Sequence, residues 1–300
     1  MKRYIWILPI VLLCSNLMAE VHSQAGDFGY KFLNIPATPL SLSMAGLGFY
    51  NAGNNGAWIM QPANSAMHSD KSASASHSTW LGDTAYTSLI FSHAKRSSHI
   101  GLAIRNLSYG EIDKRDEKGT LLGTYNPADV GISGNYALRL TPNLYAGANL
   151  SVAYQKLDTA SAMALVADLG VSTRTLLKDS QVSIALRNLG ISNKMDEESI
   201  KLPYSIDLSV YKGFRMGDQH LSLEGAVMAP PDADPQLMFA TELTLLERLN
   251  LRAGYKMNSD SSALSAGFGV NISHFNLDYG FAPYEEGLGD VHSFGLSYHF

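Results

Sequence analysis

The side chains that could do chemistry are scattered along the chain, and they form no recognisable catalytic or metal-binding motif. Nine histidines are present, and no two of them have the i, i+4 helical spacing with a glutamate partner that is typical of a zinc site. Serine, histidine and aspartate from separate strands could assemble a hydrolytic triad, but no trio stands out among the many serines. The sequence therefore predicts a protein that is not an enzyme and that has no metal site and no cofactor.

Charged residues that lie between apolar neighbours indicate more about function than the histidines and serines do. Successive side chains of a strand point to opposite faces, so a charge between two apolar residues lies on the other face from both. Eight residues have this setting: Arg105, Asp168, Arg187, Asp207, Glu224, Arg252, Lys256 and Asp278. We expect them to point into a lumen. Because both signs are present, ion pairs and water explain them most simply, and a polar path for a solute or a seat for another segment are the alternatives.

The final stretch, Asp290–Phe300, shows the type of strand that must carry these charges. Four large residues occupy alternate positions, namely Phe294, Leu296, Tyr298 and Phe300, and mostly small or polar residues lie between them. One face is therefore lipid-compatible, as in a transmembrane barrel whose last strand closes on the first. A terminal Phe after such alternation also resembles the signal that bacterial barrel-assembly machinery recognises, so this machinery is an expected partner.

The rest of the chain from residue 72 reads as strands, and the predicted fold is all-β. We predict fourteen strands at 72–81, 84–95, 98–113, 121–140, 143–157, 160–176, 180–189, 203–214, 219–228, 236–246, 249–257, 262–273, 275–283 and 290–300. Only 16% of the residues are charged, compared with about 25% in soluble proteins. No apolar run of about 20 residues follows the N-terminus, so helical membrane spans are not expected.

The predicted connections separate a membrane barrel from a soluble sandwich. Alternate connections are short, such as 141–142 and 273–274. The others include long or charged stretches such as 114–119, 190–202 and 229–235. Short turns on the periplasmic side and long external loops are typical of outer-membrane proteins. The pattern predicts a transmembrane antiparallel β-barrel of about 14 strands at 71–300, in contact with outer-membrane lipid.

Two further segments precede the barrel. Residues 1–19 are expected to be a signal peptide with a basic start at Lys2 and Arg3, and cleavage after Ala19 or at a second possible site near Ala25. The only cysteine, Cys14, follows Leu13, so lipidation is not expected. Residues 20–70 do not alternate, contain prolines and carry several aromatic residues, which favours a plug packed inside the barrel over a disordered arm.

At this point the sequence resembles the PorV/PorQ-type outer-membrane proteins of the type IX secretion system, which are related to FadL-type barrels. The resemblance rests on 32–36 (FLNIP), on Met44 and Gly46 of a Met-Ala-Gly motif, on Gln61, Pro62 and Ala63 where the family has Asn-Pro-Ala, on 154–158 with 161–170, and on the closing stretches 264–269, 277–282 and 288–294. Ala45 and Gln61 depart from the family pattern, and the usual basic residue before Met44 is missing.

The resemblance implies a fourteen-stranded barrel with an N-terminal plug and a non-catalytic role in type IX protein secretion or surface attachment. Its partners would be secretion-system subunits or surface-attached cargo proteins, docked on external loops. The alternative is a FadL-like channel for hydrophobic solutes, which would need apolar lumen residues near the plug. The predicted inward faces carry Asn, Ser, Gly and charge instead, which favours docking, and a purely structural barrel is a third possibility. A net charge of −5 argues against nucleic acid as a partner.

Overall fold

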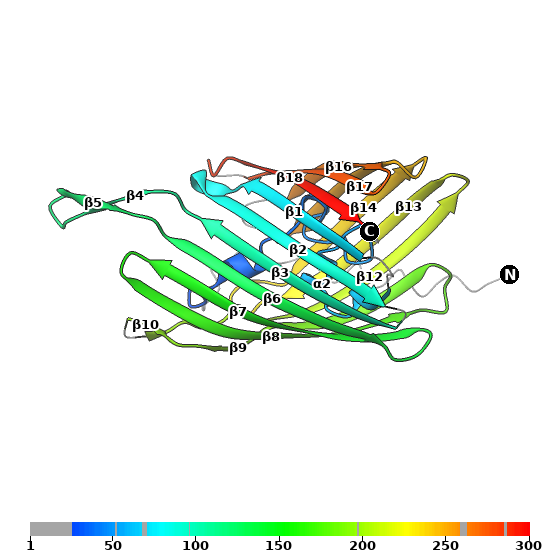
Figure 1. Ribbon diagram of the computed structural model, residues 1–300, viewed down its shortest axis with the longest axis horizontal. Helices are drawn as coiled ribbons and strands as arrows, with labels where there is room; N and C mark the ends of the chain where they lie inside the picture. The colour runs from blue at the N-terminus through cyan, green and yellow to red at the C-terminus, as the bar shows by residue number, and fades with distance from the viewer. Residues whose placement is uncertain are drawn as a thin grey trace.

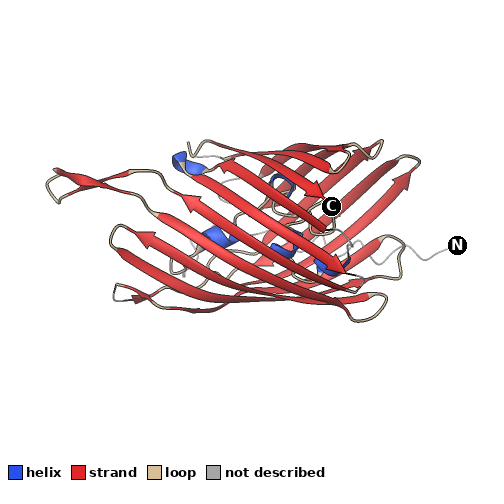
Figure 2. Cartoon of the chain, in the orientation of Figure 1, coloured by secondary structure: helices blue, strands red, loops and turns tan. Residues whose placement is uncertain are grey.

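A closed antiparallel barrel forms the body of the protein in the computed structural model (Figures 1 and 2). The structure describes residues 26–51, 53–67, 71–95, 97–196, 198–258, 263–284 and 287–300, so the predicted signal peptide and its cleavage sites lie outside the described residues. Within these ranges, the wall consists of β1 (Lys71–Thr79), β2 (Ala85–Lys95), β3 (Ser98–Ser108), β6 (Ala128–Arg139), β7 (Leu144–Leu157), β8 (Ala160–Arg174), β9 (Ser180–Ser192), β12 (Ser205–Met216), β13 (Gln219–Ala229), β14 (Gln236–Leu245), β15 (Leu249–Met257), β16 (Leu264–Ile272), β17 (Phe275–Pro283) and β18 (Asp290–His299). These fourteen strands confirm the predicted fold class.

The barrel closes where the first strand pairs with the last. The register of β1 and β18 runs from Ser72 opposite His299 to Thr79 opposite His292. All other neighbours in the wall are consecutive wall strands, joined by short connections at one end and mostly long ones at the other. We call these the short-turn end, with the connections 96–97, 140–143, 175–179, 217–218, 246–248 and 273–274, and the long-loop end, with the connections 80–84, 109–127, 158–159, 193–204, 230–235, 258–263 and 284–289.

Two predicted strand ranges were too long. The predicted strand 98–113 ends at Ser108, and the predicted strand 121–140 begins only at Ala128. Between them, β4 (Ile112–Arg115) and β5 (Leu121–Tyr125) pair with each other as a separate hairpin that extends beyond the barrel (Figure 1). Their residues are almost all exposed because no wall strand or inner residue covers them. A second small hairpin, β10 (Lys194–Met195) with β11 (Glu198–Ser199), lies in the connection between β9 and β12.

The burial of the wall strands is inverted relative to a soluble protein. On β8, for example, Leu165, Leu169 and Val171 face outward and are exposed, whereas Asp168 and Ser172 on the opposite face are buried. A continuous outer surface of large apolar side chains is stable only where lipid surrounds it. The alternation therefore specifies both the strand faces and the membrane environment of the barrel.

Residues 26–51 and 53–67, which we call the inner segment, lie within the barrel (Figure 2). They contain two short α-helices, α1 (Pro39–Ser43) and α2 (Ala57–Met60), and two 3-10 turns, η2 (Lys31–Asn34) and η3 (Asn64–Met67). A third 3-10 turn, η4 (Leu81–Asp83), lies in the loop between β1 and β2. Most inner-segment side chains are buried, among them Tyr30, Met44 and Trp58. In the described part of the chain, no helix is long and apolar enough to cross a membrane.

Helix α1 rests on glycines of the wall. A Cβ atom built on Gly280 would lie 2.4 Å from the Pro39 carbonyl oxygen, and one on Gly267 would lie 2.5 Å from the Ser43 Cβ. On Gly254 it would lie 2.4 Å from the Ala45 backbone nitrogen. These distances leave no room for any side chain, so the backbones of α1 and of the wall strands β15, β16 and β17 pack directly together. We call Gly254, Gly267 and Gly280 the glycine seat.

Candidate functional site in the barrel interior

The structure places all eight charged residues predicted to face the lumen on inward faces of wall strands. Seven of them are buried, and Lys256 is half-buried. They do not form one cluster, and most of them lie against the inner segment. Two further buried acidic residues, Asp129 and Glu242, belong to the same inward set and were missed. Asp129 sits between Ala128 and Val130, and Glu242 between Thr241 and Leu243.

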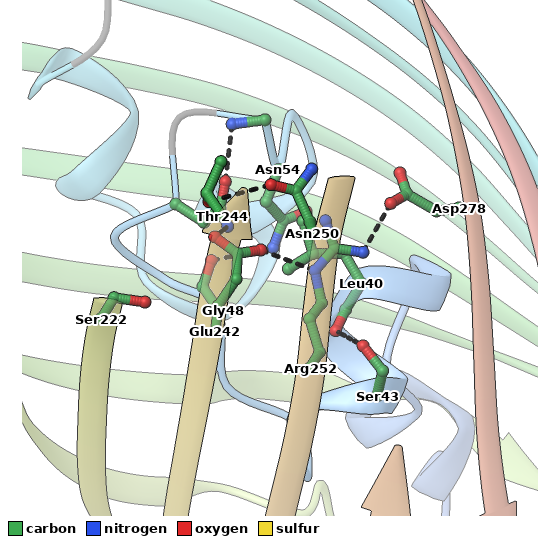
Figure 3. A network of polar contacts seen from close by, with 12 residues as sticks. Leu40, Ser43, Gly48, Asn54, Ser222, Glu242, Thr244, Asn250, Arg252 and Asp278 are labelled. Carbon is green, nitrogen blue, oxygen red and sulfur yellow. Dashed lines mark hydrogen bonds and ion pairs between the residues drawn. The ribbon is translucent and has the colours of Figure 1, made fainter. Parts of the chain in front are cut away.

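Arg252 forms a compact ion-pair group with two carboxylates (Figure 3). Its Nε lies 2.6 Å from Oε2 of Glu242, and its Nη1 lies 2.5 Å from Oδ1 of Asp278. Glu242 and Arg252 are directly opposite each other on β14 and β15, and Asp278 is on β17. The side chain of Asn51 donates to the other oxygen of Glu242 at 2.6 Å. The group therefore ties three wall strands to one loop of the inner segment.

Glu224 on β13 binds the same loop through its backbone. Its carboxylate accepts hydrogen bonds from three successive N–H groups, those of Gly48 at 2.9 Å, Phe49 at 3.1 Å and Tyr50 at 3.4 Å. Successive N–H groups that converge on one anion form a nest, and the positive φ of 89° at Gly48 helps to aim them. No basic side chain pairs with Glu224 among the described residues, so the loop backbone is its charge partner.

Arg187 and Arg105, on other strands of the wall, also donate hydrogen bonds to the inner segment. Arg187 pairs with Asp207 at 3.2 Å and donates to the side-chain oxygen of Asn34 at 3.1 Å. Arg105 donates to the Leu33 carbonyl oxygen at 3.2 Å.

Asp168 reaches the inner segment through Asn149. The Asn149 amide nitrogen donates to Oδ2 of Asp168 at 2.9 Å and to the Trp58 carbonyl oxygen at 3.0 Å. Five of the eight lumen charges thus help to seat the inner segment, Arg105, Arg187 and Glu224 directly, and Asp168 and Arg252 through Asn149 and Glu242. A seat for another segment was one of the alternatives considered from the sequence. Asp207 and Asp278 are ion-paired within the wall, and Lys256 has no ion pair with any described residue.

The motif residues of the inner segment are packed against the wall. Met44 is buried in an apolar cluster with Met238, and Gly46 has a φ of 92°. Gln61, Pro62 and Ala63 pack against two wall glycines, Gly147 and Gly170. A Cβ atom built on Gly147 would lie 2.3 Å from the Pro62 carbonyl oxygen, and one built on Gly170 would lie 2.3 Å from the Gln61 side-chain oxygen. The residues that follow α2 therefore pack directly on wall glycines, as α1 does on the glycine seat.

The alternate residues of the last strand face outward. Phe294, Leu296 and Phe300 are exposed, and Tyr298 packs edge-on against Phe300 with ring centres 4.9 Å apart. The Lys71 ammonium lies over the Phe300 ring, 4.4 Å from its centre. Recognition of these residues by barrel-assembly machinery stays a prediction.

The long-loop end has an apolar interior that sequence reasoning missed. Trp80 packs against Tyr86 and Tyr284 with ring centres 6.3 and 6.0 Å apart. Leu42, Ala282 and Val291 form an adjoining apolar cluster. Much of this lining comes from loops and from the inner segment, where strand alternation gives no signal.

A cavity of about 190 Å³, which we call the long-loop cavity, lies beside this cluster. Its lining includes Leu42, Ala45, Ala282 and Tyr284, and the only described basic side chain on it is Lys256. Lys256 has no ion pair with any described residue. The site therefore combines several apolar side chains with one ammonium group that has no ion-pair partner among the described residues.

A larger cavity of about 580 Å³, the short-turn cavity, lies at the other end. Its lining is mainly polar and includes Thr244, Asn250, Asn271 and Asn276, and it reaches the Arg252 ion-pair group. The lining at this end thus consists mainly of amide, hydroxyl and charged side chains, whereas Leu, Ala and Tyr side chains take part in the lining of the long-loop cavity. Among the described residues, no group of three or more His, Cys, Asp or Glu could hold a metal ion.

Comparison with known proteins gives the fold and no family. No family model and no curated protein matches the sequence. Among solved structures, the monoaromatic hydrocarbon channel CymD superposes with a TM-score of 0.63 at 11% identity, over 89% of this chain and 97% of that one. The Pseudomonas putida toluene transporter TodX gives 0.62 at 10% identity, over 86% and 96%.

A Pseudomonas aeruginosa FadL homologue gives a TM-score of 0.56 at 9% identity, over 88% of this chain and 98% of that one. At such identities the likeness shows the fold alone. The chain therefore has the architecture of FadL-like outer-membrane barrels, of which CymD is a monoaromatic hydrocarbon channel and TodX a toluene transporter.

Proposed function

We propose that this protein is an outer-membrane channel that takes up small hydrophobic solutes, with its long loops outside the cell and its short turns in the periplasm. The observation that carries the proposal is the apolar, aromatic interior of the long-loop end. A hydrophobic solute leaves water for such a lining at about 25 cal/mol per Å² of buried apolar surface. The similarity to CymD, a monoaromatic hydrocarbon channel, and to TodX, a toluene transporter, supports it.

The long-loop cavity is the proposed first binding site. Its volume of about 190 Å³ is below the roughly 300 Å³ at which pockets for drug-sized ligands begin, so the solute is small. The Lys256 ammonium can lie over an aromatic ring or bind an anionic group on the solute. Small aromatic compounds, neutral or acidic, are the class that fits both features.

The inner segment acts as the plug of this channel. It fills the barrel between the two cavities and is held by Glu224, by the Arg252 group through Asn51, and by the glycine seat. Passage of a solute requires the segment to shift, or a route around it. The polar contacts hold the closed state.

Binding of toluene and benzoate to the purified protein tests the proposal. Saturable binding of either compound supports it, and Ala282→Leu should weaken binding because the added methyl groups fill the long-loop cavity. Ala148→Leu is the matched control, since Ala148 faces outward on β7 between the exposed residues Tyr136 and Leu169. Absence of saturable binding, or equal loss in both variants, would count against the proposal.

The second candidate is docking in the PorV/PorQ manner, with secretion-system subunits or surface-attached cargo proteins as partners. The β4–β5 hairpin favours it, because the hairpin extends beyond the barrel and carries Leu121 and Leu122 with 53% and 60% of their surfaces exposed. Affinity purification from outer membranes in mild detergent tests this role. Partner proteins that are retained by the intact chain and lost on deletion of residues 111–126 would favour docking over solute uptake.

A further inference from the structure

The short-turn cavity has the features of a binding site that solute uptake does not use. With about 580 Å³ it falls within the roughly 300–1,000 Å³ of small-molecule pockets. Its lining consists mainly of amide, hydroxyl and charged groups, with which an apolar solute forms no hydrogen bonds. Both the wall and the inner segment contribute to it, the latter through Tyr50 and Asn51.

One buried acceptor in this cavity lacks a partner. The Asn276 side chain is only 4% exposed, and its Oδ1 atom has no hydrogen-bond partner among the described residues. A buried polar atom without a hydrogen-bond partner reduces the free energy of unfolding by about 1–3 kcal/mol, so such an atom calls for a ligand or a water molecule as its partner. Because Asn276 lines the cavity, a rotation of its side chain would present this oxygen to a ligand hydroxyl.

The neighbouring groups alternate between donors and acceptors. Thr244 donates to the Asn250 side-chain oxygen at 2.9 Å, and the Asn250 amide donates to the Asn271 oxygen at 3.4 Å (Figure 3 shows Thr244 and Asn250). The Asn271 amide then donates to the Glu247 carbonyl oxygen at 3.2 Å. A chain of amides and hydroxyls of this kind matches a ligand whose own groups both donate and accept.

The charge on the lining excludes strongly charged ligands. Three acidic residues, Asp218, Glu242 and Glu247, face two basic ones, Arg215 and Arg252, and Arg252 is already neutralised by its two carboxylates. A phosphate would be repelled by the three acidic side chains, and a polycation would be repelled by the two arginines. The Tyr211 ring, packed at 5.2 Å on Tyr50, offers an apolar face beside the polar groups.

We propose that the short-turn cavity binds a neutral saccharide of one or two rings. Sugar hydroxyls both donate and accept, and their C–H faces pack on aromatic rings, so they complement the amide chain, the free Asn276 oxygen and Tyr211. The orientation proposed above puts this cavity on the periplasmic side, where cell-wall glycans are present. The assignment rests on the proposed function for this orientation, but its site lies at the opposite end from the proposed hydrophobic-solute site.

Titration with disaccharides tests the assignment. The full-length protein is purified in a detergent without a sugar headgroup, because maltoside detergents would occupy the site. Maltose and N,N′-diacetylchitobiose are then followed by saturation-transfer NMR and calorimetry. We expect saturable binding of at least one of them, weakened roughly tenfold by Asn276→Leu, which keeps the side-chain size and removes the acceptor.

Control measurements distinguish a variant that has lost the binding site from one that no longer folds. Heat-modifiable migration on gels reports an intact barrel, and Thr244→Val, which removes one hydroxyl of the amide chain, serves as a second variant with the same expected loss. Asn143→Ala removes an exposed amide from another turn at the same end and should leave binding unchanged. No saturable binding of either disaccharide, wild-type affinity in both the Asn276 and the Thr244 variants, or preferential binding of inorganic phosphate would overturn the assignment.

Discussion

The Glu224 carboxylate on β13 accepts a hydrogen bond from the Gly48 backbone nitrogen at 2.9 Å, across 176 residues of sequence. The next two N–H groups, of Phe49 and Tyr50, bind the same carboxylate. A single wall side chain thereby fixes the loop between α1 and α2. The position of the inner segment depends on this contact as well as on apolar packing.

Removing the Glu224 carboxylate should loosen the inner segment without opening the barrel. Glu224→Leu leaves three buried N–H groups without an acceptor, which we expect to cost about 1–3 kcal/mol of unfolding free energy. Glu224→Gln keeps one acceptor oxygen and should cost less. Urea titration followed by heat-modifiable migration measures stability, and limited proteolysis of residues 26–67 measures loosening. Equal behaviour of the Leu variant and the wild type would contradict this role.

A methyl group in the glycine seat should displace α1. In Gly280→Ala the new Cβ would meet the Pro39 carbonyl oxygen at 2.4 Å, and such overpacking costs about 1–3 kcal/mol. Gly134→Ala is the matched control, because a Cβ there faces outward and has its nearest neighbour at 3.9 Å. Single-channel conductance should rise only in the Gly280 variant. Similar conductance in both variants would show that α1 tolerates the change.

The Arg252 group should be sensitive to loss of its cation. Arg252→Met leaves the carboxylates of Glu242 and Asp278 buried without their partner, and breaking a buried ion pair in this way costs about 3–5 kcal/mol. Adding Glu242→Gln and Asp278→Asn should restore much of the stability, since no unpaired charge then remains. A triple variant as unstable as the single one, in the same urea titration, would argue against an electrostatic cause.

Strand alternation alone predicted the fourteen-stranded barrel and the inward faces of the charged residues. It works because lipid on one side and a polar interior on the other impose a strict period of two. The same alternation also places Glu242 and Asp129 on inward faces, although these two residues were not among those predicted. The ranges 98–113 and 121–140 were too long because the β4–β5 hairpin also has strand composition, and local pattern does not show where a strand leaves the wall.

The contacts between the wall and the inner segment could not be predicted in this way. The glycine seat depends on the path of α1 through the barrel, which no local pattern in either segment encodes. The apolar interior of the long-loop end depends on Trp80 and Tyr284, which lie in loops, and on Leu42 of α1. The inward-facing Asn, Ser and charged residues were therefore a poor guide to that end of the lumen, because its lining is largely not made of strands.

Lys256 should distinguish acidic from neutral solutes. It has no ion pair with a described residue, so Lys256→Met should change the unfolding free energy little. Loss of the ammonium should weaken benzoate binding roughly tenfold, the effect of one charge-assisted hydrogen bond. Toluene binding should change much less. Calorimetric titration of both compounds measures the difference, and a parallel loss of both would assign Lys256 a packing role instead.

The most direct test of the central claim, that a small hydrophobic solute binds inside the long-loop end, is the anomalous diffraction of crystals soaked with 4-iodobenzoate. The account predicts an iodine peak in the long-loop cavity, between Leu42, Ala282 and Lys256, and its absence in crystals of Ala282→Leu. An empty long-loop cavity in well-diffracting soaked crystals, or iodine bound only in the polar short-turn cavity, would contradict it.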